Sequence, residues 1–246
     1  MRKRNLLTDP CWRPEDLGQA LPNSPHAVSV ALPRWKDVIA YEEKDPECIN
    51  SLQSIYPRFG LNPLVAKIAK KGLESSDLKE GSCWPYPDHK TAIEAKLYCN
   101  KVNNDESVFI SDVLGLKCLI ASKKNTQAAK SFWQHTGLGA SSRLAAIALK
   151  EERAPSDEQS TFARKSLKAR LGDLYECESS LVHLYPSGMA ALTAALKCIY
   201  QFSGNSSVLQ LGFPYVDVLK LPQKIFEGSD LLLDPDLKSL EQEIKR

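Results

Sequence analysis

The sequence predicts an α/β fold, because short apolar runs of strand length alternate with segments whose apolar residues recur at helical spacing. The chain has 246 residues, of which 43% are hydrophobic and 25% are charged, and this is enough to bury a substantial core. From residue 179 to residue 246 the expected order is β-α-β-α-β-α. That order is typical of the beginning of a parallel, doubly wound sheet. A sheet that ends after three such units predicts an exposed strand edge and a truncated domain.

Composition argues against several classes of partner. The formal net charge of +2 is too balanced to indicate nucleic-acid binding, and no apolar run reaches the length of a membrane span. The seven cysteines show no CxxC spacing, and the four histidines show no ligand spacing with them, which argues against a zinc site. Scattered cysteines also favour reduced thiols, so we expect a cytoplasmic protein without a metal.

Residues 1–72 are expected to form an N-terminal extension. Three elements are predicted within it: a β-prone run at 27–32, a helix at 34–41 and a helix at 64–71. Its basic side chains either make local contacts or face the mouth of an active site, and these are His26, Arg34 and Arg58. Residues 73–90 mix Gly, Ser, Pro and charged residues, so they are expected to form a linker or long loop.

Residues 91–152 are expected to form a small α/β insert. Its predicted elements are a helix at 91–103, strands at 107–110 and 116–121, and helices at 125–135 and 141–152. Trp133 lies on an apolar helix face and is expected in the core. The start of the last helix either is simply capped by a serine or binds an anion, through Ser141, Ser142 and Arg143.

Residues 153–246 carry the strongest functional signal. An apolar run at 181–184 is expected to be a buried strand, and a tight turn then leads into a helix that ends near Gly204. Ser187 is a good N-cap, and Gly188 lacks the Cβ that would keep an anion at a distance. Free N–H groups and the helix dipole make such a helix start an anion cradle, although a plain capped core helix has the same pattern.

The stretch Ser187-Gly188-Met189-Ala190-Ala191 resembles the cofactor-phosphate loop of the pyridoxal-phosphate enzymes of cysteine and methionine metabolism, the cystathionine γ-synthase family. The segments NSPHAVSV (23–30), YPRF (56–59) and FWQHTG (132–137) resemble its fungal and cyanobacterial type. The resemblance implies an aminotransferase-like domain of fold type I, of which residues 153–246 are the first, incomplete part. It also implies pyridoxal 5′-phosphate as cofactor, with Ser187, Gly188 and Met189 at the phosphate. Tyr215 matches a family tyrosine that stacks on the pyridine ring.

The helix expected at 156–178 matches the family less well. In the wider family a Tyr-x-Arg pair at this place reaches the cofactor phosphate of the neighbouring subunit, and Phe162-Ala163-Arg164 lies in the corresponding position. The resemblance carries this role to Arg164 only, because Phe162 cannot donate the hydrogen bond of the tyrosine and the Asn-Pro-Thr turn that follows is absent. A solvated cationic face is the alternative. For the full-length protein the family implies a homo-oligomer, a dimer or a tetramer.

The activity implied by the resemblance is γ-replacement on an O-activated homoserine by cysteine, in transsulfuration and methionine biosynthesis, with small amino acids as substrates. That chemistry needs a Schiff-base lysine, which the family places well downstream of the tyrosine, and no lysine here matches its Ser-x-x-Lys setting. The sequence is therefore interpreted as an N-terminal fragment with no catalytic residue assigned. A γ-lyase or a homoserine sulfhydrylase of the same family is one alternative, and a non-catalytic binding module is another.

Overall fold

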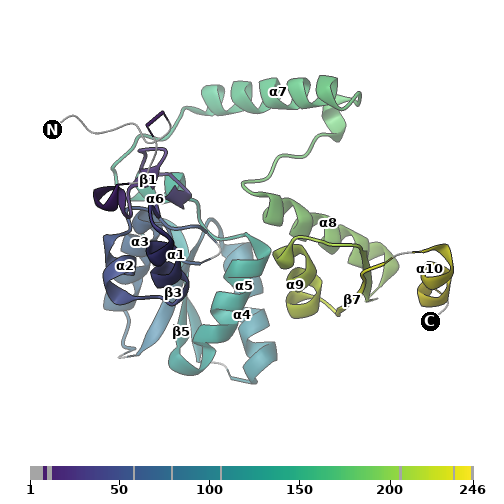
Figure 1. Cartoon of the computed structure of the whole chain (residues 1–246), viewed down its shortest axis with the longest axis horizontal. Coiled ribbons are helices and arrows are strands. Elements are labelled where there is room, and N and C mark those ends of the chain that lie inside the picture. Colours follow the sequence, from purple (N-terminus) through teal and green to yellow (C-terminus); the bar gives the residue numbers. More distant parts are fainter. Residues whose placement is uncertain are drawn as a thin grey trace.

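The computed structural model describes residues 8–9, 13–57, 59–78, 80–105, 107–204, 207–234 and 236–244. Two α/β regions lie side by side, and a long helix, α7 (Asp157–Leu174), projects away from both (Figure 1). The α/β class predicted from the sequence is confirmed. No helix in the described part of the chain combines the length and the apolar character needed to cross a bilayer.

The N-terminal part of the chain wraps over one side of the first region. Its elements are η1 (Pro14–Asp16), β1 (Ala20–Leu21), β2 (Ser29–Val30), α1 (Trp35–Glu42), α2 (Pro46–Ser51) and α3 (Pro63–Glu74). The strands β1 and β2 form a small antiparallel pair, so the expected run at 27–32 contributes only its centre to a strand. The helix expected at 64–71 is present as α3, and the side chain of Asn62 caps it by accepting a hydrogen bond from the backbone N–H of Leu64 at 2.9 Å.

A three-stranded antiparallel sheet in the order β3-β5-β4 is the centre of the first region. The strands are β3 (Gly81–Tyr86), β4 (Val108–Val113) and β5 (Leu116–Ser122). The expectation of a loop over residues 73–90 is therefore wrong, because β3 lies within them. Proline lacks the N–H that a central strand must donate, but β3 is an edge strand and tolerates Pro85. The proline and glycine signals thus concealed a strand that buries its last four residues.

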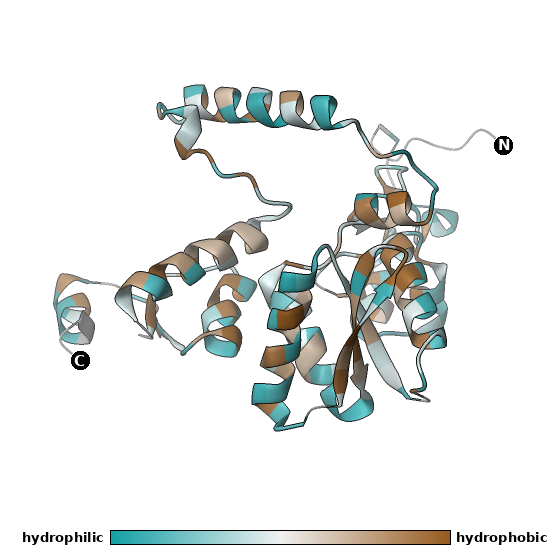
Figure 2. Cartoon of the chain, turned by 180° about the vertical axis from the view of Figure 1, so that it is seen from behind, coloured by the Kyte–Doolittle hydropathy of each residue, from teal (hydrophilic) through white to brown (hydrophobic). Residues whose placement is uncertain are grey.

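Helices cover both faces of this sheet. α3 and α6 (Ser142–Ala148) pack on one face, whereas α4 (His89–Asn103) and α5 (Thr126–Thr136) pack on the other. Side chains of β5 alternate between the two cores, with Ile120 in the first and Leu119 in the second. Apolar residues are frequent in the sheet between these helices (Figure 2). Trp133 lies in the second core as predicted, with its ring centroid 5.2 Å from that of Trp84.

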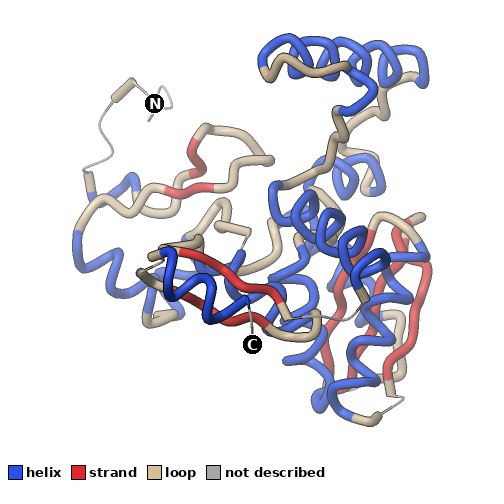
Figure 3. The backbone as a smooth tube through the Cα atoms, turned by 90° about the vertical axis from the view of Figure 1, so that its right-hand side faces the viewer, coloured by secondary structure: helices blue, strands red, loops and turns tan. Residues whose placement is uncertain are grey.

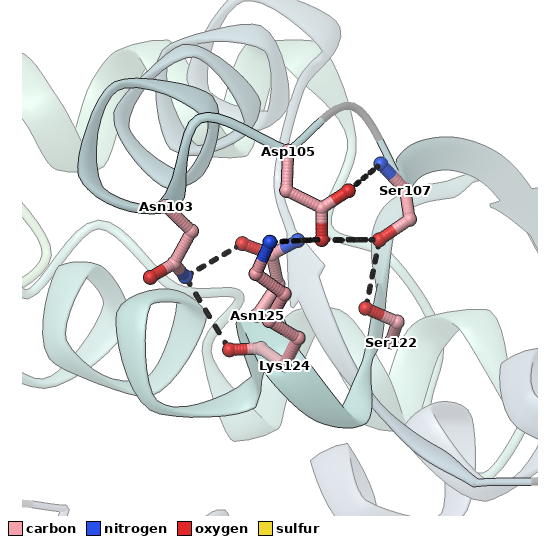
Figure 4. Close-up of polar contacts among 6 residues, drawn as sticks. All are labelled: Asn103, Asp105, Ser107, Ser122, Lys124 and Asn125. Atoms are coloured by element: carbon pink, nitrogen blue, oxygen red, sulfur yellow. Dashed lines mark hydrogen bonds and ion pairs between the residues drawn. The ribbon is translucent and has the colours of Figure 1, made fainter.

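A polar network fixes the loop between α4 and β4 at one end of the sheet (Figure 4). The Asp105 carboxylate accepts hydrogen bonds from the Ser107 N–H at 3.0 Å and from the Asn125 side chain at 2.9 Å. The Asn103 side-chain amide donates to the side-chain oxygen of the fully buried Asn125 at 2.8 Å. Asn125 belongs to η2 (Lys123–Asn125), which immediately precedes α5, so the network connects the end of α4 and the loop after it to the start of α5.

The second region contains α8 (Gly188–Ser203), β6 (Val208–Leu211), α9 (Val216–Ile225), β7 (Ser229–Leu232) and α10 (Leu237–Ile244). β6 and β7 pair in parallel with α9 as their connection, as expected. The strand predicted at 181–184 is wrong, because Leu181 ends the short helix η3 (Ser179–Leu181) and residues 182–184 continue as chain without strand pairing. This segment runs between α7 and α8 and pairs with none of the strands in the described part of the chain (Figure 3).

Candidate cofactor-phosphate site

The start of α8 has the geometry predicted for a capped helix. Ser187 adopts an extended backbone conformation, with φ −152° and ψ 162°, and its hydroxyl accepts a hydrogen bond from the Ala190 N–H at 3.1 Å. The helix ends at Gly204, also as expected, with φ 71°. Since the cap satisfies the amide of Ala190, the amides of Gly188 and Met189 are the helix N–H groups left at the open end.

The space in front of Gly188 is open. A Cβ built on Gly188 would meet no described atom within 4 Å, and the residue is exposed to solvent. The positive end of the helix dipole therefore lies at an exposed surface, where an anion can approach the backbone closely. A phosphate group fits these residues, because it needs several N–H donors and close approach to the backbone.

The rear of the same turn is closely packed. α5 ends at Gly137, which has φ 65°, and the carbonyl of Gly137 accepts a hydrogen bond from the Ser187 hydroxyl at 3.3 Å. A Cβ on Gly137 would lie 2.7 Å from both the Met189 Cβ and the Ser187 Oγ. The first region of the fold thus supports the α8 turn from behind.

Two further contacts connect the end of α5 to the second region. The Thr193 hydroxyl of α8 donates to the backbone carbonyl of Thr136 at 2.9 Å, and both residues are fully buried. His135 Nδ1 lies 3.3 Å from an oxygen of Asp217 on α9, and both side chains are almost completely buried. Burial lowers the pKa of His135 and outweighs the opposite effect of Asp217, with Lys220 and Lys224 adding to the lowering.

Tyr215 occupies the N-cap position of α9, two residues before Asp217, and its side chain is about half exposed. Partial burial raises the pKa of Tyr215, and the neighbouring side chains of Tyr56 and Asp217 raise it further. Tyr56 belongs to the N-terminal extension, so residues from the extension and from α9 meet at this phenol. The stacking role of Tyr215 stays a prediction.

Arg164 lies on α7 and is exposed. The structure does not bring it to the start of α8 within one chain, since α7 projects away from α8 (Figure 1). The resemblance predicts that Arg164 contacts the cofactor phosphate of a neighbouring subunit. The geometry of a single chain does not test this contact, which stays a prediction.

The other candidate residues make local contacts or connect the extension to the first region. The Ser141 hydroxyl caps α6 by accepting from the Leu144 N–H at 3.2 Å, which agrees with the simple capping interpretation. His26 contacts the Ser142 hydroxyl at 3.0 Å and the Glu152 carboxylate at 2.7 Å. Arg34 pairs with Asp37 at 2.8 Å, whereas Arg58 lies outside the described residues.

Sequence reasoning missed the residues that support the site from α5 and α9. A glycine after an apolar helix indicates a left-handed C-terminal residue, and this signal was present at Gly137. Its proximity to Ser187, 50 residues later, had no local signal. The burial of Asp217 was equally invisible, because a carboxylate in the first turn of a helix is normally a surface residue. Among the described residues no cluster of His, Cys, Asp and Glu has the arrangement of a metal site.

The fold and the open helix start place the chain among α/β proteins with a helix N-terminus suited to an anion. A cystathionine gamma-synthase of Saccharomyces cerevisiae is 27% identical over 153 residues, which are 55% of this chain and 24% of that protein. A second S. cerevisiae protein named for the same enzyme is 31% identical over 155 residues, with the same shares. The L-2-amino-4-chloropent-4-enoate dechlorinase/desaturase of Streptantibioticus cattleyicolor is 27% identical over 226 residues, which are 88% of this chain and 45% of that protein.

The resemblance to the cystathionine γ-synthases is therefore confirmed, and the chain is a relative of these proteins. It spans about a quarter to about half of the length of the curated relatives that it matches. No protein-family model matches the chain, and no solved structure does so.

Proposed function

We propose that the whole protein is a pyridoxal-phosphate-dependent enzyme of the cystathionine γ-synthase type, which replaces the γ-substituent of an O-activated homoserine with cysteine. The chain described here contributes the extension, the first α/β region and the part of the cofactor domain that binds phosphate. The open, capped start of α8 is the observation that carries this proposal, and the similarity to cystathionine γ-synthases supports it.

Each residue of the site has a separate part in binding. The amides of Gly188 and Met189 donate to the phosphate, the hydroxyl of Ser187 holds the turn through its bonds to Gly137 and Ala190, and the ring of Tyr215 stacks on the pyridine. When bound, pyridoxal phosphate supplies an electron sink that stabilises negative charge on the substrate carbon. The resemblance assigns the Schiff-base lysine to none of the lysines in this chain, so these residues bind and orient the cofactor only.

The proposed oligomer uses α7. Three of its apolar side chains, those of Phe162, Leu167 and Leu174, are 72%, 50% and 71% exposed. Apolar side chains that stay in water within one chain fit burial against a second copy, which would also bring Arg164 to the phosphate of the neighbouring subunit.

A charge series at Gly188 tests the phosphate site. Gly188→Asp places a carboxylate where a helix start favours one, so we expect unchanged or slightly higher stability, by about 0.3–1 kcal/mol. The same carboxylate repels phosphate, and we expect binding of pyridoxine 5′-phosphate to weaken at least about tenfold, measured by calorimetry. This probe carries the phosphate but lacks the aldehyde that reacts with lysines.

Gly188→Lys is the matched control, since it adds a side chain at the same position with the opposite charge. We expect Gly188→Lys to bind pyridoxine 5′-phosphate at least as tightly as the wild type, and unphosphorylated pyridoxine to bind poorly to all three proteins. Equal affinities for the Asp and Lys variants would rule out a phosphate at the start of α8. Formation of cystathionine from an O-acylated homoserine and cysteine by the whole protein separates the synthase from a γ-lyase, a sulfhydrylase or a non-catalytic module.

A further inference from the structure

We infer that the C-terminal turn of α5, His135–Gly137, is a positioning element that holds the phosphate-binding turn of α8 in its working geometry. The inference rests on the proposed role of α8 and goes beyond it, because α5 belongs to the first α/β region rather than to the expected cofactor domain. Within this element Gly137 is the positioning residue that contacts the turn directly.

The contact at Gly137 leaves no room for a side chain. A Cβ there would lie 2.7 Å from the Ser187 Oγ and 3.0 Å from the Ala190 backbone nitrogen, the two atoms that form the cap. Only hydrogen at this position allows the carbonyl of Gly137 to accept the Ser187 hydroxyl while that hydroxyl accepts the Ala190 amide. The cap of α8 is therefore shaped by a residue of the first region.

Two buried contacts reinforce this arrangement. The hydrogen bond from Thr193 to the carbonyl of Thr136 fixes the second turn of α8 against the same helix end. The buried side chains of His135 and Asp217 lie against each other, with 3.3 Å between His135 Nδ1 and the Asp217 carboxylate, which places the first turn of α9 beside the same helix end. Thr136 and Gly137 thus contact α8, and His135 contacts α9. These two helices carry the proposed cofactor-binding residues.

The helix end is itself rigidly held. Phe132 and Trp133 of α5 belong to the second core of the first region and are 3% and 8% exposed. A turn supported by such a core cannot shift without disturbing close-packed side chains. The α8 turn is consequently preorganised before any ligand binds, which reduces the cost of ordering it on binding.

The test compares Gly137→Ala with Gly115→Ala in the full chain. Both glycines have positive φ, 65° and 86°, so alanine strains the backbone at each, but a Cβ at Gly115 would meet no described atom within 4 Å. For Gly137→Ala we expect binding of pyridoxine 5′-phosphate to weaken about tenfold relative to the wild type. We also expect the hydrogen-bonded Ala190 amide to exchange with solvent about tenfold faster in the absence of ligand, because its acceptor is displaced.

For Gly115→Ala we expect both values to stay within about twofold of the wild type. If Gly137→Ala binds the probe and protects Ala190 as Gly115→Ala does, Gly137 does not position the turn. If the wild type itself does not bind the probe, the proposed phosphate site fails instead. Thr193→Val is the second variant if Gly137→Ala does not fold: it removes only the buried bond to Thr136, and unchanged binding and Ala190 exchange in that variant would overturn the inference.

Discussion

Asp105 shows how a single carboxylate connects several elements. The hydrogen bond from the Ser107 side chain lowers the pKa of Asp105 most, and the hydrogen bond from the Ser107 backbone N–H lowers it further. Lys124 and Asn125 add smaller effects in the same direction. A carboxylate with a lowered folded-state pKa stabilises the fold above its ordinary pKa of about 3.9 and loses this contribution as pH falls through the lower folded value.

Asp105→Asn removes that titration, so we expect its stability to fall less steeply than that of the wild type as pH decreases from about 5 to 2. Urea unfolding at successive pH values measures the difference. Asp173→Asn, on the exposed surface of α7, is the matched control and should follow the wild type. Parallel curves for all three proteins would contradict a stabilising role of the Asp105 carboxylate.

His135 gives a second dependence on pH, in a higher range. Burial lowers its pKa, so the folded protein keeps the ring neutral at pH values where the unfolded chain, with a pKa of about 6.5, binds a proton. The contribution of the neutral ring is therefore present above about pH 6.5 and is lost as pH falls below it.

His135→Asn keeps a nitrogen donor facing Asp217 but cannot titrate. We expect its unfolding free energy to decline less than that of the wild type between about pH 7 and 5, measured by urea denaturation. His89→Asn, at an exposed histidine, is the matched control. Wild-type stability that rises as pH falls would instead indicate a protonated ring paired with Asp217.

At the scale of elements, α7 and α8 differ in what their leucines contribute. The side chain of Leu174 is 71% exposed, whereas Leu196 is 7% exposed within α8. We expect Leu174→Ala to change the unfolding free energy of the chain by about 0.5 kcal/mol or less. The identical substitution Leu196→Ala should cost about 2–5 kcal/mol, because it leaves a cavity.

Urea denaturation of the two variants provides the comparison, and each variant is the control for the other. A cost at Leu174 similar to that at Leu196 would show that α7 packs against the rest of its own chain. A cost at Leu174 that appears only as protein concentration rises would instead point to burial between copies.

The elements also show what sequence patterns can and cannot predict. Helices with a capping residue and an apolar face were located well, as α3 and α8 demonstrate. Strands depend on partners that lie elsewhere in the chain. The apolar run at 181–184 has no partner and is not a strand, while the proline-containing segment of β3 is one because β5 offers its edge.

At the scale of the whole molecule, the site is assembled from two regions, and only one of them was predictable. The N-cap of Ser187 and the open position of Gly188 follow from local sequence, since capping and the absence of a Cβ are local properties. The support from Gly137, Thr136 and His135 depends on how the first region docks against α8 and α9. Such docking is a property of the folded surfaces, and no periodicity or spacing reports it.

The exposed course of α7 has a consequence for proteolysis. Arg164, Lys165 and Arg170 are exposed on its surface, and trypsin can cut beside them when the helix opens locally. A cut there breaks the polypeptide between the first region and α8. Ile225 of α9 packs against the second core, and Lys197 of α8 pairs with Glu94 of α4. The two pieces of a nicked chain would therefore remain associated in native buffer and separate only on denaturation.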